Sequence, residues 1–362
     1  MGYSIREEVL GMDIYKAGKP ISEVKRELQL KKVIKLASNE NPLGCSPKVK
    51  EVLSDLVEHT NLYPDASNHE LKGEISKKFN VDMDEIFCGT GSDSLIKVIC
   101  NTLLNPGDEC IMGEVTFSRY MHSTQLMGGK SVIIPMKDNA LDIEKMVDSI
   151  TDKTKIIWFC NPNNPTGTIF TKDQFEKVID KIPSNVVIIM DEAYIEYVTS
   201  KDFPDSLELR KKYPNIVILR TFSKAYGLAG LRCGFGIGDK ELVKYFNTVI
   251  GPFDVNLFAQ RAATAALKDT KFIDEVRKVN IEGKKYICKE FEAMGLKYVP
   301  TETNFIMVNI EREDKEVFDS LLRKGVIIRP GSLLGMPKWL RVTIGSMEQN
   351  KVFIEELKNC LK

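Results

Sequence analysis

Three short runs of consecutive apolar residues constrain the fold of this chain more than any other feature of its sequence. They are residues 156–160 (IIWFC), 186–190 (VVIIM) and 216–219 (IVIL). A strand with one wetted face alternates apolar and polar residues, so runs without alternation indicate strands covered on both faces. A capping box at residues 171–174 (TKDQ) predicts the start of a helix between two of the runs. The sequence therefore predicts an α/β fold with a mostly parallel central sheet covered by helices.

Each apolar run leads directly into an unusual polar segment. These segments are residues 161–167 (NPNNPTG), 191–194 (DEAY) and 220–224 (RTFSK). Ligands of open α/β sheets bind beyond the carboxyl ends of the strands. We therefore expect the three segments to face one shared cleft.

The remainder of the chain indicates a second, smaller unit. The length of 362 residues suggests about two domains. Residues 269–295 form a long amphipathic pattern, and short strand candidates follow at residues 305–308, 326–328 and 340–344. We predict an N-terminal arm or part of the small domain at residues 1–38, a large cofactor-binding domain at 39–260 and a small α+β domain at 261–362.

Composition excludes several classes of function. Lys and Arg together number 51, as do Asp and Glu, so the chain lacks the strongly basic character of a nucleic-acid binder. It has no run of the ~18 apolar residues that a membrane span needs, and its first 20 residues do not resemble a signal peptide, so we expect a cytoplasmic protein. The eight cysteines form no CxxC pair and the three histidines have no ligand spacing, so no metal site is expected.

A glycine-containing segment at residues 89–93 (GTGSD) separates a strand-like from a helix-like stretch. Backbone N–H groups at such a helix start can bind an anion, although a simple tight turn has the same pattern. The third glycine of a dinucleotide-binding fingerprint is absent, which disfavours NAD.

Lys224 and Asp191 give the polar segments a specific chemistry. A lysine held in a cleft can form a Schiff base with an aldehyde, and Thr221, Ser223 and Arg232 could bind a phosphate beside it. Asp191 could pair with a protonated ring nitrogen, as a pyridoxal phosphate site requires. Each residue also has an ordinary interpretation, such as a solvated lysine or a turn cap, but together they favour that cofactor.

The quoted segments, with TFSKAYGLAGLRCG and RVTIG, resemble the fold-type I, pyridoxal-phosphate-dependent aminotransferases. The segments IKLASNENPLG, Tyr63-Pro64-Asp65 and IIRPG make the chain similar to the histidinol-phosphate aminotransferase branch of that family. The resemblance extends from about Tyr15 to Leu357.

The resemblance implies roles for individual residues. Lys224 would form the internal aldimine, Asp191 would keep the pyridine nitrogen protonated, and Tyr194 and Asn164 would bind the ring hydroxyl. The remaining cofactor contacts would come from stacking by Phe117 and from phosphate binding by Ser92, Asp93, Thr221, Ser223 and Arg232. Substrate contacts would come from Asn164, from Arg341 on a carboxylate, and from Arg329 and Tyr15 on a distal phosphate. Tyr63 would reach the site of a neighbouring subunit, which implies a homodimer.

The reaction implied is amino transfer between histidinol phosphate and 2-oxoglutarate, giving imidazole acetol phosphate and glutamate, in either direction and by a ping-pong mechanism, in histidine biosynthesis. An aromatic or broad-specificity aminotransferase and a threonine-phosphate decarboxylase remain alternatives on the same scaffold. A non-catalytic regulator fused to a DNA-binding module is disfavoured because the charge is balanced.

Overall fold

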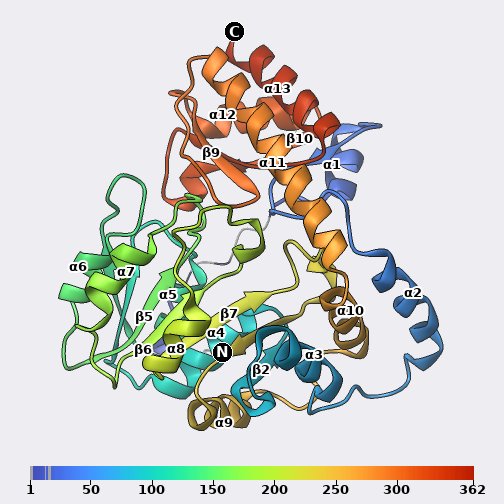
Figure 1. Ribbon diagram of the computed structural model, residues 1–362. Helices are drawn as coiled ribbons and strands as arrows, with labels where there is room; N and C mark the ends of the chain where they lie inside the picture. The colour runs from blue at the N-terminus through green and yellow to red at the C-terminus, as the bar shows by residue number, and fades with distance from the viewer. Residues whose placement is uncertain (1–2, 13, 15–17) are drawn as a thin grey trace.

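The computed structural model describes residues 3–12, 14 and 18–362, and a seven-stranded sheet lies at its centre (Figure 1). The spatial order of the strands is β2-β8-β7-β6-β5-β3-β4. Strand β8 is antiparallel to both of its neighbours, and the other adjacent strands pair in parallel. The strands are β2 Ile86–Gly89, β3 Glu109–Gly113, β4 Lys130–Ile134, β5 Thr154–Cys160, β6 Val187–Asp191, β7 Ile216–Thr221 and β8 Gly234–Ile237.

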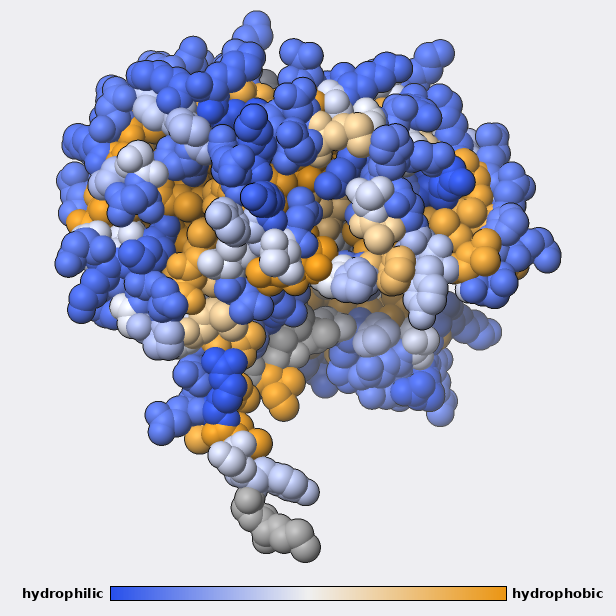
Figure 2. All heavy atoms as spheres, turned by 90° about the horizontal axis from the view of Figure 1, so that it is seen from below, coloured by the Kyte–Doolittle hydropathy of each residue, from blue (hydrophilic) through white to orange (hydrophobic). Residues whose placement is uncertain are grey.

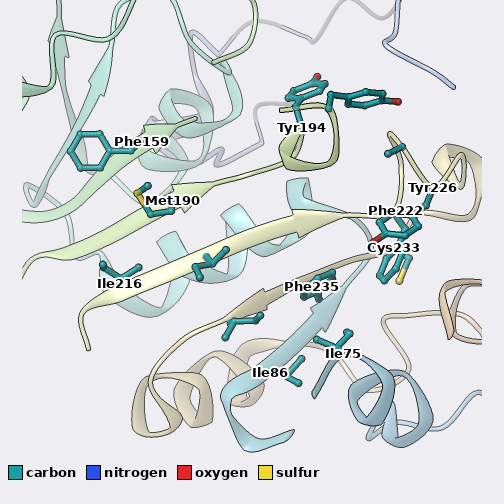
Figure 3. Close-up of a cluster of buried hydrophobic side chains, with 14 of the residues drawn as sticks. Ile75, Ile86, Phe159, Met190, Tyr194, Ile216, Phe222, Tyr226, Cys233 and Phe235 are labelled. Carbon is teal, nitrogen blue, oxygen red and sulfur yellow. The ribbon is translucent and has the colours of Figure 1, made fainter. Parts of the chain in front are cut away.

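The predicted fold class is confirmed, and the three apolar runs form the adjacent parallel strands β5, β6 and β7. Successive side chains of each strand enter different cores, which explains why the runs do not alternate. In β5, Ile157 and Phe159 belong to one core, whereas Ile156 and Trp158 belong to the core on the opposite face. Figure 3 shows side chains of the first core, including Phe159, Met190, Ile216 and Phe235.

The helices cover both faces of this sheet and also pack around the smaller sheets described below. They are α1 Ile21–Leu28, α2 Pro47–Asp55, α3 His69–Phe79, α4 Ser92–Leu103, α5 Arg119–Leu126, α6 Ile143–Asp148, α7 Lys172–Ile179, α8 Ser206–Lys212, α9 Lys240–Val249, α10 Leu257–Leu267, α11 Thr270–Ala293, α12 Asp314–Arg323 and α13 Met347–Leu361. Short 3-10 helices are η1 Glu7–Val9, η2 Leu56–His59, η3 Met83–Glu85, η4 Ile195–Tyr197, η5 Ala229–Leu231 and η6 Gly331–Leu334. The capping box predicted for α7 is present, with Thr171 as the N-cap and Gln174 closing it.

A second core packs around smaller sheets, above the central sheet in Figure 1. Strands β11 (Arg329–Pro330), β12 (Trp339–Thr343) and β9 (Phe305–Asn309) form an antiparallel sheet in the order β11-β12-β9. Strand β1 (Ile34–Lys35) pairs in parallel with β10 (Val326–Ile327). The strand candidate at 326–328 corresponds to β10, and β11, which follows it at Arg329–Pro330, joins the antiparallel sheet instead.

Helix α11 connects the two cores. Near its start, Phe272 and Val276 pack in the first core, and near its end Ile287 and Phe291 pack in the second. Its 24 residues give it a length of about 36 Å, enough to span both layers. The helix therefore couples the two packing units through one continuous element.

The face of the molecule shown in Figure 2 is mainly hydrophilic, with hydrophobic patches between the hydrophilic residues. Within residues 3–12, 14 and 18–362, no helix is long and apolar enough to cross a bilayer. The same residues contain no group of three or more His, Cys, Asp or Glu side chains placed to hold a metal ion.

Candidate active site

Two adjoining cavities lie at the carboxyl ends of the central strands. The smaller has a volume of about 130 Å³ and the larger about 490 Å³. The two cavities share Phe117, Asn164, Tyr194 and Lys224. The smaller is lined by Ser92, Asp93, Phe117, Cys160, Asn164, Asp191, Ala193, Tyr194, Thr221, Ser223, Lys224 and Arg232.

The sheet topology explains why these residues meet. Asp191 is the last residue of β6 and Thr221 is the last residue of β7, and Asn164 follows the end of β5. Because β5, β6 and β7 are adjacent and parallel, their carboxyl ends open onto the same edge. The three polar segments of the sequence therefore line one cavity.

Asp191 is a buried carboxylate held by two hydrogen bonds. The Tyr120 hydroxyl donates to its Oδ2 at 2.6 Å, and the Ala193 N–H donates to its Oδ1 at 3.2 Å. Burial raises the pKa of Asp191 to about 6, because a charged carboxylate is poorly solvated there, and the hydrogen bond from Tyr120 opposes that rise. A cationic partner in the cavity would favour the ionised form of Asp191.

Lys224 lies between the two cavities. Its Nζ donates to the Ser38 carbonyl at 3.1 Å and lies 5.7 Å from the centre of the Tyr194 ring. Burial and then the nearby charge of Arg341 lower the pKa of Lys224 to about 7. A substantial fraction of this amine is therefore neutral, and thus nucleophilic, near neutral pH.

Tyr194 and Asn164 belong to one hydrogen-bond network. The Tyr194 hydroxyl accepts from Asn39 Nδ2 at 2.9 Å and from Asn164 Nδ2 at 3.4 Å. Asn164 Oδ1 accepts from Arg341 at 2.6 Å. The network therefore links both cavities and fixes the orientation of two side chains that face them.

The start of helix α4, Ser223 and Arg232 also line the smaller cavity, and we call this group the anion cradle because its chemistry suits an anion. Helix α4 begins at Ser92, so the unpaired backbone N–H groups of its first turn and its dipole favour negative charge there. Gly91 has a φ of +84°, and a Cβ on it would lie 2.8 Å from Arg232. Arg232 Nη1 in turn donates to Ser223 Oγ at 3.4 Å, so the guanidinium and the hydroxyl are close neighbours.

Two arginines line the larger cavity from neighbouring strands. Arg329 of β11 and Arg341 of β12 are directly paired in register, and each is only 8% exposed. Arg341 Nη2 also donates to the Ala37 carbonyl at 2.8 Å. Two guanidinium groups opposite each other repel, so this end of the cavity is suited to an anionic ligand.

The donor set of the smaller cavity fits pyridoxal phosphate. The helix start, the hydroxyls and Arg232 suit a phosphate, and Asp191 suits a protonated ring nitrogen. Lys224 suits an aldehyde, and the Phe117 side chain offers a face for stacking. These groups would contact the phosphate, the ring nitrogen, the aldehyde and the ring face of the cofactor.

The structure brings together most of the site residues expected from the sequence. Twelve of the expected residues line the two cavities. Arg329 and Arg341 line the larger cavity, and the smaller one is lined by the other ten, which are Ser92, Asp93, Phe117, Asn164, Asp191, Tyr194, Thr221, Ser223, Lys224 and Arg232. Tyr63 lies outside both cavities, 81% exposed and stacked on Phe253 with 4.6 Å between ring centres. Tyr15 lies outside the described residues.

Sequence reasoning missed three contributors. Tyr120 contacts Asp191, Asn39 contacts Tyr194, and the Ser38 carbonyl contacts Lys224. Ser38 and Asn39 lie within the quoted ASNENPLG segment, so that motif could have indicated them. Tyr120 is 71 residues from Asp191 in sequence, and no local pattern signals the contact.

This fold and site define a pyridoxal-phosphate-type aminotransferase scaffold, and the chain belongs to the aminotransferase class I and II family, whose model matches residues 31–357. It is 46% identical to the histidinol-phosphate aminotransferase of Moorella thermoacetica, over 98% of this chain and 92% of that protein. It is 45% identical to histidinol-phosphate aminotransferase 2 of Carboxydothermus hydrogenoformans, over 99% of both chains.

A solved structure has the same fold. The crystal structure of histidinol-phosphate aminotransferase from Sinorhizobium meliloti in complex with pyridoxal-5'-phosphate superposes with a TM-score of 0.92. The match covers 100% of this chain and 98% of that chain at 22% sequence identity.

Proposed function

We propose that this chain is a histidinol-phosphate aminotransferase that uses pyridoxal 5'-phosphate and exchanges the amino group with 2-oxoglutarate, in histidine biosynthesis. The observation that carries the proposal is the position of Lys224, which lines both cavities. One amine thus faces both the smaller cavity, which contains Asp191, and the larger cavity, which contains the arginine pair. The names of the relatives support the choice of substrate.

Pyridoxal phosphate, when bound, supplies an aldehyde that takes up an amino group and a ring that draws electrons from the substrate's Cα–H bond. Asp191 would hold a proton on the ring nitrogen, and the Tyr194 and Asn164 side chains would orient the ring through its hydroxyl. Lys224 Nζ would remove the proton from the substrate Cα and deliver a proton to the cofactor carbon that carries the aldehyde. Its pKa of about 7 suits both the uptake and the release of a proton near neutral pH.

The arginine pair explains how one site could accept two different substrates. Histidinol phosphate carries a phosphate and no carboxylate, whereas glutamate carries two carboxylates. A guanidinium group binds either anion with two parallel hydrogen bonds. We propose that Arg329 binds the phosphate in one half-reaction and the side-chain carboxylate in the other, and that Arg341 binds the α-carboxylate.

Several predictions about the whole protein accompany this function. We propose a homodimer in which Tyr63 reaches the active site of the neighbouring subunit. Its ring is exposed beside Phe253 and does not line either cavity of its own chain. The division into residues 1–38, 39–260 and 261–362, the contact of Tyr15 with substrate phosphate and the cytoplasmic location stay predictions.

The first experiment tests the cofactor and the catalytic lysine together. Purified protein mixed with pyridoxal phosphate should gain the visible absorbance of a lysine-bound cofactor, and Lys224→Ala should lose both that absorbance and turnover. Lys284→Ala is the matched control, because Lys284 Nζ also donates to a backbone carbonyl, that of Thr301, at 2.9 Å. Turnover retained by Lys224→Ala would remove Lys224 from the reaction.

The second experiment tests the substrate. A panel of amino donors is assayed with 2-oxoglutarate, and histidinol phosphate should give the highest kcat/KM. Higher activity on phenylalanine would favour an aromatic aminotransferase. Release of carbon dioxide from threonine phosphate without consumption of a keto acid would favour the decarboxylase.

A further inference from the structure

Tyr120 of α5 is a buried tyrosine whose hydroxyl meets the Asp191 carboxylate. Its side chain has no exposed surface, and its hydroxyl lies 2.6 Å from Asp191 Oδ2. That distance is typical of a strong hydrogen bond from a hydroxyl to a charged oxygen. Helix α5 thus contributes a polar contact to a carboxylate that belongs to β6.

Aromatic packing fixes the position of the Tyr120 ring. The ring stacks on Trp158 of β5 with 4.5 Å between ring centres and 12° between planes. It also meets the edge of Phe117, with 5.7 Å between centres and 82° between planes. Tyr120 therefore contacts both the carboxylate and the aromatic residue that line the smaller cavity, and it has little freedom to turn its hydroxyl away from Asp191.

The register of the sheet places these groups on one face. Cys160 of β5 pairs with Asp191 of β6, and Trp158 lies two residues before Cys160 on the same face of the strand. Tyr120 packs on that face in the same core as Trp158 and Cys160. The carboxylate therefore sits at the boundary between an apolar core and the cavity, where an unassisted negative charge is costly.

Resting on the proposed function, we propose that Tyr120 is a positioning residue that orients the Asp191 carboxylate and keeps it ionised, so that the proton shared with the cofactor's ring nitrogen stays on the nitrogen. The hydroxyl supports Oδ2 from the core side, and the Ala193 N–H supports Oδ1. Loss of the hydroxyl makes the carboxylate more basic, and the shared proton then moves toward Asp191.

The test is Tyr120→Phe in protein loaded with pyridoxal phosphate labelled with ¹⁵N in the ring. The phenyl ring keeps the stacking on Trp158 and removes only the hydroxyl. We expect the ¹⁵N resonance to move toward the value of an unprotonated pyridine. We also expect kcat to fall about 10- to 100-fold, the equivalent of one hydrogen bond to a charged group. KM for the amino donor should stay within about twofold, because substrate contacts are unchanged.

A second replacement tests the opposite direction without removing a polar group. 3-Fluorotyrosine incorporated at position 120 is almost the same size as tyrosine and has a more acidic hydroxyl, so it is a stronger donor. The pH at which the ring nitrogen loses its proton, followed by the ¹⁵N resonance, should then rise. This replacement keeps the proposal falsifiable if the Tyr120→Phe protein fails to fold.

Tyr197→Phe is the control, because Tyr197 of η4 is also a buried tyrosine but packs in the opposite core. It should leave the ¹⁵N resonance and kcat unchanged. The role of Tyr120 would be overturned by an unmoved ¹⁵N resonance in Tyr120→Phe, by an unmoved pH midpoint in the 3-fluorotyrosine protein, or by an equal shift in Tyr197→Phe. Wild-type protein that binds no pyridoxal phosphate would instead refute the proposed function, and with it the role of Tyr120.

Discussion

At the scale of single residues, the protonation state of Lys224 governs how readily the site reacts with an aldehyde. Burial and then the charge of Arg341 together lower the pKa of Lys224 to about 7. Below that pH the amine is protonated and cannot attack a carbonyl, and above it the amine is neutral. We therefore expect the rate of pyridoxal phosphate uptake by cofactor-free protein to rise with pH, with a midpoint near 7.

The rate is measured by stopped-flow absorbance across a pH series. Arg341→Gln should move the midpoint upward, because removal of a nearby positive charge favours the protonated amine. A midpoint close to the ordinary lysine value of 10.5 in the unmodified protein would show that Lys224 is not desolvated as described.

Arg329 should discriminate between anionic and uncharged substrates. Replacement by alanine removes a nearly buried guanidinium from the larger cavity. We expect kcat/KM for histidinol phosphate to fall about 100-fold or more, because charge-assisted hydrogen bonds are lost, and that for phenylalanine to fall less than about threefold. Arg323→Ala, at the exposed end of α12, is the control. Equal losses on both substrates would argue against a phosphate-binding role.

At the scale of elements, the anion cradle depends on the close approach of β8 to the start of α4. Gly234 of β8 pairs with both Gly89 and Thr221, and a Cβ on it would lie 2.7 Å from the Ser92 nitrogen. Gly234→Ala should therefore displace the first turn of α4 and weaken pyridoxal phosphate binding about tenfold or more, since each displaced hydrogen bond to a charged group is worth about 1.5–3 kcal/mol.

The dissociation constant is measured by fluorescence titration of cofactor-free protein. Gly230→Ala is the matched control, because a Cβ there would meet no atom within 4 Å. If the two alanine variants bind the cofactor equally well, the position of the α4 start is not set by Gly234.

The elements that could be predicted from the sequence are those with a strong local signal. The apolar runs predicted β5, β6 and β7, and the capping box at Thr171 predicted the start of α7. Strand β8 (GFGI) has too many glycines to read as a strand, and β1 has only two residues. Each has a partner distant in sequence, β10 for β1 and β2 for β8, which no local pattern records.

The same distinction applies to the site. Lys224 and Asp191 follow buried strands within recognisable motifs, so their type and position indicated their chemistry. The pairing of Arg329 with Arg341 depends on the register of β11 and β12, and the contact of Tyr120 with Asp191 depends on packing of α5 against the sheet. Such contacts are properties of the tertiary structure and could not be read from spacing.

At the scale of the whole molecule, Ile34 and Leu36 near the amino end of the chain pack in the second core. Leu36 is 1% exposed, its N–H donates to the Ile327 carbonyl at 2.7 Å, and its carbonyl accepts from the Thr343 N–H at 2.9 Å. Leu36→Ala should lower the free energy of unfolding by about 2–5 kcal/mol, through lost burial and the cavity left behind.

Urea denaturation measures that change. Leu28→Ala is the control, because Leu28 is 36% exposed at the end of α1, and it should change the free energy by less than about 1 kcal/mol. Equal effects of the two replacements would mean that Leu36 does not stabilise the second core.

The bond between Arg341 and the Ala37 carbonyl joins residues 304 positions apart. Ribosomes deliver a chain from its amino end, and the earlier part of a large protein generally folds first. Lys224 and Asp191 are thus synthesised long before Arg341, so the residues of the smaller cavity are present in a nascent chain that does not yet contain the arginine pair. Translation that stops short of β11 would yield a product with the residues that line the smaller cavity but without the two cations that we expect to select its substrates.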